Sequence, residues 1–304
     1  EFYFYSKLKE QLTQKTVIRV QEIRSDYKIS IYSNKNVFEI FYNWKEFKKF
    51  MLQINNSEIY INNLVGYKNI PRLLKFLADI KSDNKIIMLG HDYFSVCPSW
   101  NLINDKGEYC DVPSIEICEK CSANNSYVFK KYDKEMKNIK KWKADWGNFL
   151  KKPANELVVF SQNSKSIFTK AYPELENKIN CIPHEMQQFE NPVFYDSTKS
   201  DIINIVAIGN ICFIKGSEII DKMAEIIKQK GYKNVKLNIV GKYSGGGDVT
   251  VEGEYDIKNL PEILSRIKPS IIFIPSIWPE TFSYTTSEAM MLKYPVACFN
   301  LGAP

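Results

Sequence analysis

The sequence lacks any apolar run long enough to cross a bilayer, since no stretch approaches the ~20 consecutive apolar residues that a membrane-spanning helix needs. Its first residues, Glu1-Phe2-Tyr3-Phe4-Tyr5, also lack the basic-then-apolar layout of a signal peptide. A strong net charge is missing too: +6 is too small for this length to argue for nucleic acid, though it is compatible with a phosphorylated ligand or an anionic membrane surface. No internal repeat or low-complexity tract is present. These absences favour a globular cytoplasmic protein that does not bind nucleic acid.

Length and composition predict two domains. A chain of 304 residues exceeds the usual size of a single core, and 44% hydrophobic with 25% charged residues is typical of globular proteins. The sequence starts without Met and stops at Pro304, directly after a strand-like segment at 296–300. We therefore expect part of a larger polypeptide with a truncated C-terminal end.

The second half has the regular alternation of an α/β domain. Apolar strands are predicted at 202–209, 236–241, 271–276 and 296–300, and helices at 215–230, 258–267 and 282–292. Strands that alternate with helices form a parallel sheet covered on both faces. The pattern predicts a Rossmann-like domain over residues 200–304.

The first half is less regular, yet it also predicts an α/β domain. Short strands are predicted at 85–90, 157–161 and 178–183, and helices at 71–80 and 163–172. The segments 28–33 and 37–42 predict a hairpin, which indicates an antiparallel addition at the domain edge. The polar segment 183–200 contains two prolines and predicts a hinge, so we assign the first domain to residues 1–190.

Two carboxylates eight residues apart, Glu280 and Glu288, lie where the apolar segment 271–276 meets the helix that follows. Open α/β sheets bind ligands at the carboxyl ends of their strands, and eight residues is slightly over two helical turns. A purely structural explanation also exists, in which Glu280 caps the helix and Glu288 is a solvated helix residue.

The segment PETFSYTTSEAMMLKYPVACFNLGAP resembles the E-x(7)-E signature of retaining GT-B glycosyltransferases, especially glycosyltransferase family 4. The resemblance implies two Rossmann-like domains facing across a cleft, with a nucleotide-sugar donor held mainly by the second. It implies that Glu280 is a catalytic residue near the donor sugar and that Glu288 holds the ribose. Thr281, Phe282 and Ser283 would belong to the same donor site.

A second element follows the strand at 202–209. Gly209 permits a tight turn, and Lys215 and Gly216 stand at the start of a helix whose free amide groups favour an anion. The segment resembles the G-R-x(4)-K-G element of the same family, whose basic residues bind the donor diphosphate. Asn210 replaces the Arg, so one of two charges that would stabilise the departing nucleoside diphosphate is absent. On this motif alone, a solvated first-turn residue is the favoured explanation of Lys215, whereas the carboxylate pair downstream favours the diphosphate-binding role.

His91 and Asp92 follow the predicted strand at 85–90 and are the candidates for chemistry in the first half. This segment resembles many family members, which have a His-Asp pair at the same place, near the donor phosphate or the acceptor. The resemblance implies that Asp92 acts as a general base and that His91 is a hydrogen-bonding catalytic residue. In the alternative, Asp92 caps the next turn and His91 is structural.

Four cysteines lie in the loop 97–121 with the spacing C-x(12)-C-x(7)-C-x(2)-C: Cys97, Cys110, Cys118 and Cys121. Four thiolates match the ligand set of a tetrahedral structural zinc, and C-x(2)-C is a knuckle spacing. Four cysteine ligands leave no open coordination position on the metal, so such a site would order the loop and would not catalyse a reaction. Disulfides, which a reducing cytoplasm disfavours, and free thiols are the other two interpretations.

Aromatic and apolar residues recur at three- and four-residue intervals over 127–150, which predicts an amphipathic helix. The apolar set is Phe129, Tyr132, Met136, Ile139, Trp142, Trp146 and Phe149, and the other face carries Lys130, Lys131, Lys134, Lys137, Lys140 and Lys141. Such a helix either lies on an anionic membrane leaflet or packs its aromatic stripe into the domain core.

Together, the resemblance implies a hexosyl- or related glycosyltransferase with no metal or other cofactor at its reaction centre. It would move a sugar, with retention, from a nucleotide-sugar donor to a glycan or lipid-linked saccharide acceptor in cell-surface polysaccharide synthesis, in the cytoplasm or at the inner face of the membrane. Two alternatives stay open. One is an epimerase or phosphorylase on the same fold, and the other is a catalytically impaired nucleotide-sugar-binding module of a larger glycosyltransferase polypeptide.

Overall fold

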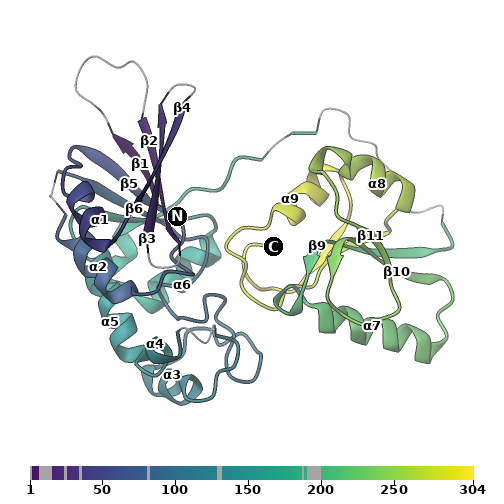
Figure 1. The fold of residues 1–304 in the computed structure, drawn as a ribbon. Coiled ribbons are helices and arrows are strands. Elements are labelled where there is room, and N and C mark those ends of the chain that lie inside the picture. The colour runs from purple at the N-terminus through teal and green to yellow at the C-terminus, as the bar shows by residue number, and fades with distance from the viewer. Residues whose placement is uncertain are drawn as a thin grey trace. The chain divides into compact units, whose positions relative to one another are not determined.

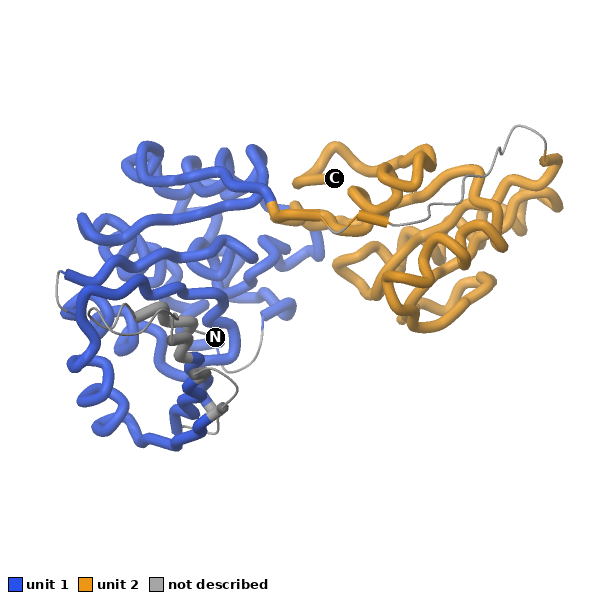
Figure 2. Tube along the Cα trace, turned by 90° about the horizontal axis from the view of Figure 1, so that it is seen from above, with its two compact units in different colours: residues 1–183 blue, residues 184–304 orange. Residues whose placement is uncertain are grey.

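The chain divides into two compact units, Glu1–Pro183 and His184–Pro304 (Figure 2). The computed structural model describes residues 2–6, 16–23, 26–33, 36–80, 83–128, 132–186, 188–189 and 200–304. The division lies at the start of the segment 183–200 that the sequence suggests as a hinge.

The unit His184–Pro304 is built on a five-stranded parallel sheet. Its strands are β9 (Ile203–Ile211), β10 (Val235–Tyr243), β11 (Thr250–Gly253), β12 (Ile271–Ile274) and β13 (Val296–Cys298). Its helices are α7 (Ser217–Lys230), α8 (Leu260–Ile267) and α9 (Tyr284–Met291), with the 3-10 turns η4 (Phe213–Lys215) and η5 (Ile257–Asn259). The predicted parallel α/β architecture of the second half is confirmed.

Apolar clusters cover both faces of this sheet, because successive side chains of a strand point to opposite faces. On β9, Val206 and Ile208 pack in a cluster that includes residues of α8 and α9, whereas Ala207 packs in a cluster with residues of α7. Figure 1 shows α7 on one side of the sheet and α8 and α9 on the other. The sheet is therefore the middle layer of three.

The strand order of this sheet, β11-β10-β9-β12-β13, places the first strand in the centre. From β9 the chain proceeds outward on one side to β10 and β11, and it then returns to the other side of β9 for β12 and β13. The loops that leave β9 and β12 therefore diverge in opposite directions. Such a switch point leaves a crevice at the carboxyl ends of the two strands, which is where doubly wound folds bind ligands.

The unit Glu1–Pro183 is built on an eight-stranded mixed sheet of order β4-β3-β2-β1-β5-β6-β7-β8. The strands are β1 (Phe2–Ser6), β2 (Thr16–Ile23), β3 (Asp26–Ser33), β4 (Asn36–Tyr42), β5 (Ser57–Ile61), β6 (Lys85–Leu89), β7 (Asn155–Val159) and β8 (Ile179–Cys181). Strands β5 to β8 are parallel, whereas β1 to β4 form an antiparallel meander that joins β5. The predicted hairpin and its edge position are confirmed by the pairing of β3 with β4.

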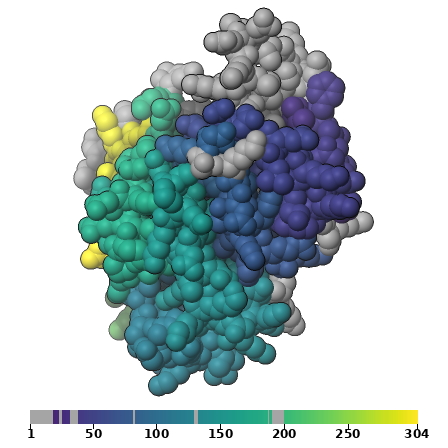
Figure 3. Space-filling model, turned by 90° about the vertical axis from the view of Figure 1, so that its left-hand side faces the viewer, coloured from purple at the N-terminus to yellow at the C-terminus, as the bar shows by residue number. Residues whose placement is uncertain are grey.

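The helices of this unit are α1 (Trp44–Met51), α2 (Ile70–Ala78), α3 (Ile115–Ser122), α4 (Asp133–Met136), α5 (Ile139–Leu150) and α6 (Gln162–Ala171), followed by the 3-10 helix η2 (Pro173–Lys178). Local signals set several of their starts. Asn43 forms a capping box with Glu46 at α1, and the Ser161 side chain accepts from the Ser164 N–H at α6. Figure 3 shows that residues of the second half of the unit, coloured teal, lie directly beside purple and blue residues of the first half.

The region 127–150 differs from the single amphipathic helix predicted for it. It forms α4 and α5, two separate helices, and Phe129, Lys130 and Lys131 lie outside the described residues. The other members of the aromatic stripe are all buried in this unit: Tyr132, Met136, Ile139, Trp142, Trp146 and Phe149. The described members of the aromatic stripe therefore belong to the core of this unit, and they do not form an exposed apolar face that could lie on a membrane.

Among the helices that the structure describes, none combines the length and the apolar character that crossing a bilayer requires.

Candidate functional site

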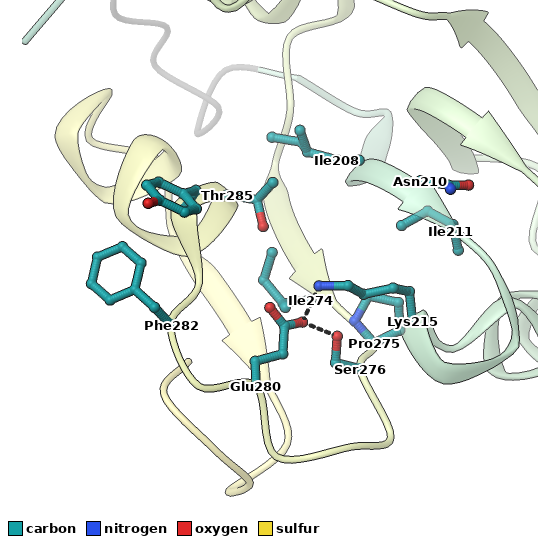
Figure 4. A pocket seen from close by; sticks show the side chains of 12 residues that line it. Ile208, Asn210, Ile211, Lys215, Ile274, Pro275, Ser276, Glu280, Phe282 and Thr285 are labelled. Carbon is teal, nitrogen blue, oxygen red and sulfur yellow. Dashed lines mark hydrogen bonds and ion pairs between the residues drawn. The ribbon is translucent and has the colours of Figure 1, made fainter. Parts of the chain in front are cut away.

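A cavity of about 240 Å³ lies in the unit His184–Pro304, at the carboxyl ends of β9 and β12 (Figure 4). Its lining comes from three segments: the end of β9 and the turn after it, the end of β12, and the loop that enters α9. The lining residues are Ile208, Gly209, Asn210, Ile211, Lys215, Ile274, Pro275, Ser276, Glu280, Phe282, Tyr284 and Thr285. The cavity thus occupies the switch point of the sheet.

Glu280 and Lys215 meet in this cavity. The Lys215 Nζ lies 2.8 Å from the Glu280 Oε1, and the Ser276 Oγ donates a hydrogen bond to the same oxygen. Figure 4 shows the three side chains converging from separate stretches of chain. Glu280 is buried, while the Lys215 side chain is 34% exposed and so remains accessible to a ligand. The ion pair between Lys215 and Glu280 was not predicted from the sequence.

A close approach of two loops holds Lys215 near Glu280. Lys215 ends η4, and Gly216 adopts a left-handed conformation with φ of 82° before α7 begins. A Cβ on Gly216 would lie 2.1 Å from the Pro275 carbonyl oxygen, so only glycine permits this contact between the start of α7 and the end of β12. Helix α7 begins at Ser217, so the helix start predicted at Lys215 is two residues too early.

The backbone of Glu280 is held by the last residues of the chain. The Ala303 N–H donates to the Glu280 carbonyl oxygen at 2.9 Å, and a Cβ on Gly302, whose φ is 79°, would lie 2.5 Å from the Glu280 nitrogen. The segment after β13 therefore packs tightly against the loop that carries the carboxylate.

Gly209 and Asn210 close the β9 side of the cavity. Gly209 has a φ of 116°, which favours glycine, and its carbonyl oxygen is approached closely by Gly241 of the neighbouring strand. The Asn210 side chain is exposed and lines the cavity, so the position where the related motif has Arg does face this space.

The loop between Glu280 and α9 divides its side chains between cavity and core. Phe282 lines the cavity, whereas Thr281 and Ser283 are buried outside the lining. The hydroxyl groups of Ser283 and Thr286 share a hydrogen bond of 2.8 Å across the first turn of α9. The His184 ring packs against the Phe282 ring at 5.0 Å between centroids, which braces this wall of the cavity.

Glu288 does not line the cavity. It is half-buried on α9, and burial raises the pKa of its carboxyl group. Burial and the charge of Glu288 together raise the pKa of Tyr255 to about 12. The structure therefore brings Lys215 and Glu280 together in the cavity but leaves the second carboxylate of the pair outside the cavity lining.

In the unit Glu1–Pro183, His91 and Asp92 follow β6 directly. The His91 ring stacks on the Phe160 ring at 4.5 Å. Asp92 accepts hydrogen bonds from the Phe94 N–H at 2.8 Å and from the Asn63 Nδ2 at 2.5 Å. Burial raises the Asp92 pKa to about 6, against the opposing effect of the Phe94 N–H. Asp92 therefore caps the turn after β6, and a carboxyl group with this pKa is also suited to proton transfer.

The four cysteines of the predicted zinc site line a second cavity in the same unit. All seven cysteines of the chain are free thiols, so no disulfide competes for them. Over the described part of the chain, which includes Cys97, Cys110, Cys118 and Cys121, no three His, Cys, Asp or Glu side chains are arranged to hold a metal ion as they stand.

Neither a protein-family model nor a curated protein matches the sequence. Solved structures do match its fold. Anabaena Alr3699/HepE in complex with UDP-glucose matches over 85% of this chain and 63% of its own, with 15% identity and a TM-score of 0.48. The pneumococcal O-GlcNAc transferase GtfA, in complex with UDP and GlcNAc, matches over 95% and 56%, with 13% identity and a TM-score of 0.47.

The catalytic domain of starch synthase IV from Arabidopsis thaliana, bound to ADP and acarbose, matches over 99% of this chain and 71% of its own, with 9% identity and a TM-score of 0.47. The chain spans less than two thirds of the HepE and GtfA chains that it matches.

Several lining residues were not identified from the sequence. Ser276 was assigned to the strand, although a polar residue at the end of an apolar run is a signal for a strand terminus that faces a ligand. Tyr284 and Thr285 were assigned only to the helix. Their place in the cavity depends on where α9 begins, which the sequence pattern does not fix to a single residue.

Proposed function

We propose that this protein is a retaining glycosyltransferase that takes a nucleotide-sugar as donor and a glycan or lipid-linked saccharide as acceptor, in cell-surface polysaccharide synthesis. The observation that carries the proposal is the meeting of Lys215, Glu280 and Ser276, from three separate segments, in one cavity at the switch point of a parallel sheet. The E-x(7)-E and K-G elements identify Glu280 and Lys215 independently of the structure.

The proposed donor site uses the opposite charges of the pair for different parts of one ligand. The Lys215 ammonium group neutralises the diphosphate and stabilises the charge that develops on it as the sugar departs. The Glu280 carboxylate accepts hydrogen bonds from sugar hydroxyl groups. Their present ion pair keeps both side chains in place before the donor binds, and the diphosphate then shares Lys215 with Glu280.

The remaining residues have supporting roles in this proposal. The Gly209 and Gly216 turns let the backbone approach the diphosphate. Phe282 forms a wall of the sugar pocket, with Thr281 and Ser283 fixing the loop behind it. Glu288, on α9 and outside the cavity lining, takes the ribose.

On the acceptor side, we propose that Asp92 and His91 contribute to binding and proton transfer. The raised pKa of Asp92, about 6, supports this role, because a base works best with a pKa near the operating pH. Peripheral membrane contact is not part of the proposal, since the aromatic stripe that suggested it is buried.

Asn210 favours a second candidate function, a nucleotide-sugar-binding module with impaired catalysis. It faces the cavity where the related motif has Arg, so the site holds one cation for a diphosphate that carries more than one negative charge. This candidate predicts that donors bind but are not consumed.

Calorimetry with a panel of nucleoside diphosphates and their sugars tests donor binding. We expect at least one nucleoside diphosphate to bind the intact chain. Glu280→Gln should weaken the binding of the sugar nucleotide more than the binding of the nucleoside diphosphate alone. Glu225→Gln is the charge-matched control, because Glu225 is an exposed carboxylate of α7 that pairs with Lys222. No binding by any member of the panel would end the proposal.

Assays of turnover then separate the candidate functions. Transfer of the sugar to a saccharide acceptor supports the transferase. Binding without consumption supports the binding module, and interconversion of sugar nucleotides or release of a sugar phosphate supports an epimerase or phosphorylase.

A further inference from the structure

A second cavity of about 630 Å³ lies in the unit Glu1–Pro183, and the four cysteines of the loop 97–121 all line it. The other three cysteines of the chain, Cys181, Cys212 and Cys298, do not. This cavity has no part in the proposed transfer reaction. Cys97 is nevertheless tied to the candidate acceptor side, because its N–H donates to the Tyr93 carbonyl oxygen at 3.0 Å in the turn after His91 and Asp92.

The fold brings the four cysteines from distant points of the loop to one place. The antiparallel bridge between Ile103 and Tyr109 folds the chain back on itself, and the Cys110 N–H donates to the Leu102 carbonyl oxygen at 3.0 Å. Cys118 and Cys121 stand three residues apart on α3, a spacing that puts both on one side of the helix.

Each of the four sulfur atoms lies beside a nitrogen donor. The Ser99 N–H donates to the Cys97 sulfur and the Val112 N–H to the Cys110 sulfur, in both cases from two residues further along the chain. The Lys143 Nζ lies 3.5 Å from the Cys118 Sγ, and the Asn125 Nδ2 lies 3.5 Å from the Cys121 Sγ. Donors around a sulfur atom fix its orientation, as the outer hydrogen bonds of metal ligands do.

The backbone beside Cys110 is conformationally unfavourable. Asp111 and Val112 have φ values of 49° and 44°, and a β-branched residue rarely adopts this left-handed conformation. Such a conformation is strained and persists only where surrounding contacts require it. Here it aims the Val112 N–H at the Cys110 sulfur.

We propose that Cys97, Cys110, Cys118 and Cys121 bind one structural zinc ion. No three of them are arranged to hold a metal as they stand, so binding requires the thiol groups to turn toward one point in the cavity. Cys118, for example, gives up its hydrogen bond to the Pro113 carbonyl oxygen, which spans 3.8 Å.

The charge balance of this site is acceptable. The four thiols release four protons as they bind one Zn²⁺, which leaves two net negative charges on the cluster. The cavity lining also carries one carboxylate, Asp105, and three lysines whose charges offset the negative total: Lys106, Lys120 and Lys143. Four sulfur ligands fill a tetrahedral zinc ion, so the metal orders the loop and leaves no position for substrate.

Metal analysis of the intact chain tests this proposal. After expression with added zinc, we expect about one zinc ion per chain. Cys118→Ser and Cys121→Ser should each lose most of it, whereas the matched controls Cys181→Ser and Cys212→Ser should retain it. Zinc in the intact chain no higher than in Cys118→Ser, or an equal loss in Cys181→Ser, would overturn the proposal.

Because a serine variant can fail to fold, a second measurement uses the unaltered chain. Removing zinc with a chelator should lower the melting temperature and raise the number of reactive thiols by four, and added zinc should reverse both changes. A cobalt-loaded sample should show the absorption of a tetrahedral cobalt–thiolate centre. An unchanged thiol count after chelation, or a disulfide among the four cysteines in the protein purified under reducing conditions, would contradict zinc binding.

Discussion

The pair formed by Lys215 and Glu280 links stability to the proposed donor site at the scale of single residues. Lys215→Ala leaves the buried Glu280 carboxylate without its cation. We expect a loss of about 1–3 kcal/mol in the free energy of unfolding, because an uncompensated buried charge is costly. Urea unfolding of the variant beside wild type measures this loss, and the exposed control Lys222→Ala should change stability by less than about 0.5 kcal/mol.

The double variant Lys215→Ala/Glu280→Gln identifies the cause of that loss. If the unpaired charge is responsible, removing both charges should cost less than the sum of the two single changes. Strict additivity would show that the ion pair at 2.8 Å contributes nothing to stability.

Gly216 offers a matched pair of glycine substitutions. Gly216→Ala would place a Cβ 2.1 Å from the Pro275 carbonyl oxygen, whereas Gly231, also left-handed with φ of 69°, has nothing within 4 Å of its Cβ position. Both substitutions bear the cost of the left-handed backbone, about 1 kcal/mol. We expect Gly216→Ala to lose about 1–3 kcal/mol more in urea unfolding, because the two loops must separate. Equal losses would show that their close approach is not required.

Asp92 gives the unit Glu1–Pro183 a specific pH dependence. Its pKa is about 6 in the fold against an ordinary value of 3.8 for an aspartate carboxyl group, so between these values the folded state binds more protons than the unfolded state. Stability from this group is therefore highest at low pH and falls as pH rises through about 4 to 6.

Asp92→Asn should remove that dependence. Relative to the variant, wild type should lose about 1–3 kcal/mol between pH 4 and pH 7, measured as free energies of unfolding at both values. Asp201→Asn, at an exposed aspartate, should change nothing between the two values. A wild-type chain that gains stability over this range relative to Asp92→Asn would contradict the assignment.

The sequence supplied much of the candidate site but not its geometry. Lys215, Glu280, Asn210 and Phe282 were all predicted for one site, and all line one cavity. Their ion pair was not predicted, because it depends on the contact between Gly216 and Pro275, which lie about sixty residues apart in sequence. The position of Glu288 outside the cavity was not predicted. Residue spacing shows on which face of a helix a residue lies, but not which other part of the protein that face contacts.

At the scale of elements, α5 is joined to the turn after β6 by buried aromatic contacts. The Trp142 Nε1 donates to the Phe94 carbonyl oxygen at 2.9 Å, and the two rings pack edge to face at 4.9 Å. Trp142→Phe should cost about 1–3 kcal/mol in urea unfolding, since it leaves a buried acceptor unsatisfied. Lys140→Ala, on the exposed side of the same helix, should be nearly neutral.

Elements with a clear period were predicted, whereas part of the antiparallel region at the start of the chain was not. The apolar run of β12 and the long helix α7 repeat their patterns over their whole length. Strands β1, β2 and β5 were missed: β1 pairs with its neighbour β2 and with the distant β5, and strand propensity depends on such neighbours. The predicted helix at 127–150 breaks at Lys137 and Asn138, although its apolar spacing continues on both sides.

At the scale of the whole chain, each unit has its own sheet and its own cavity, so ligands of the two cavities should act on separate residues. Hydrogen exchange read by mass spectrometry on one intact sample tests this. A nucleoside diphosphate should slow exchange at the ends of β9 and β12 and in the first turn of α9, because its proposed site lies wholly within His184–Pro304. Removing zinc should speed exchange in the loop 97–121 and in α3. Protection by the nucleotide confined to Glu1–Pro183 would place the donor in the wrong unit and refute the proposed site.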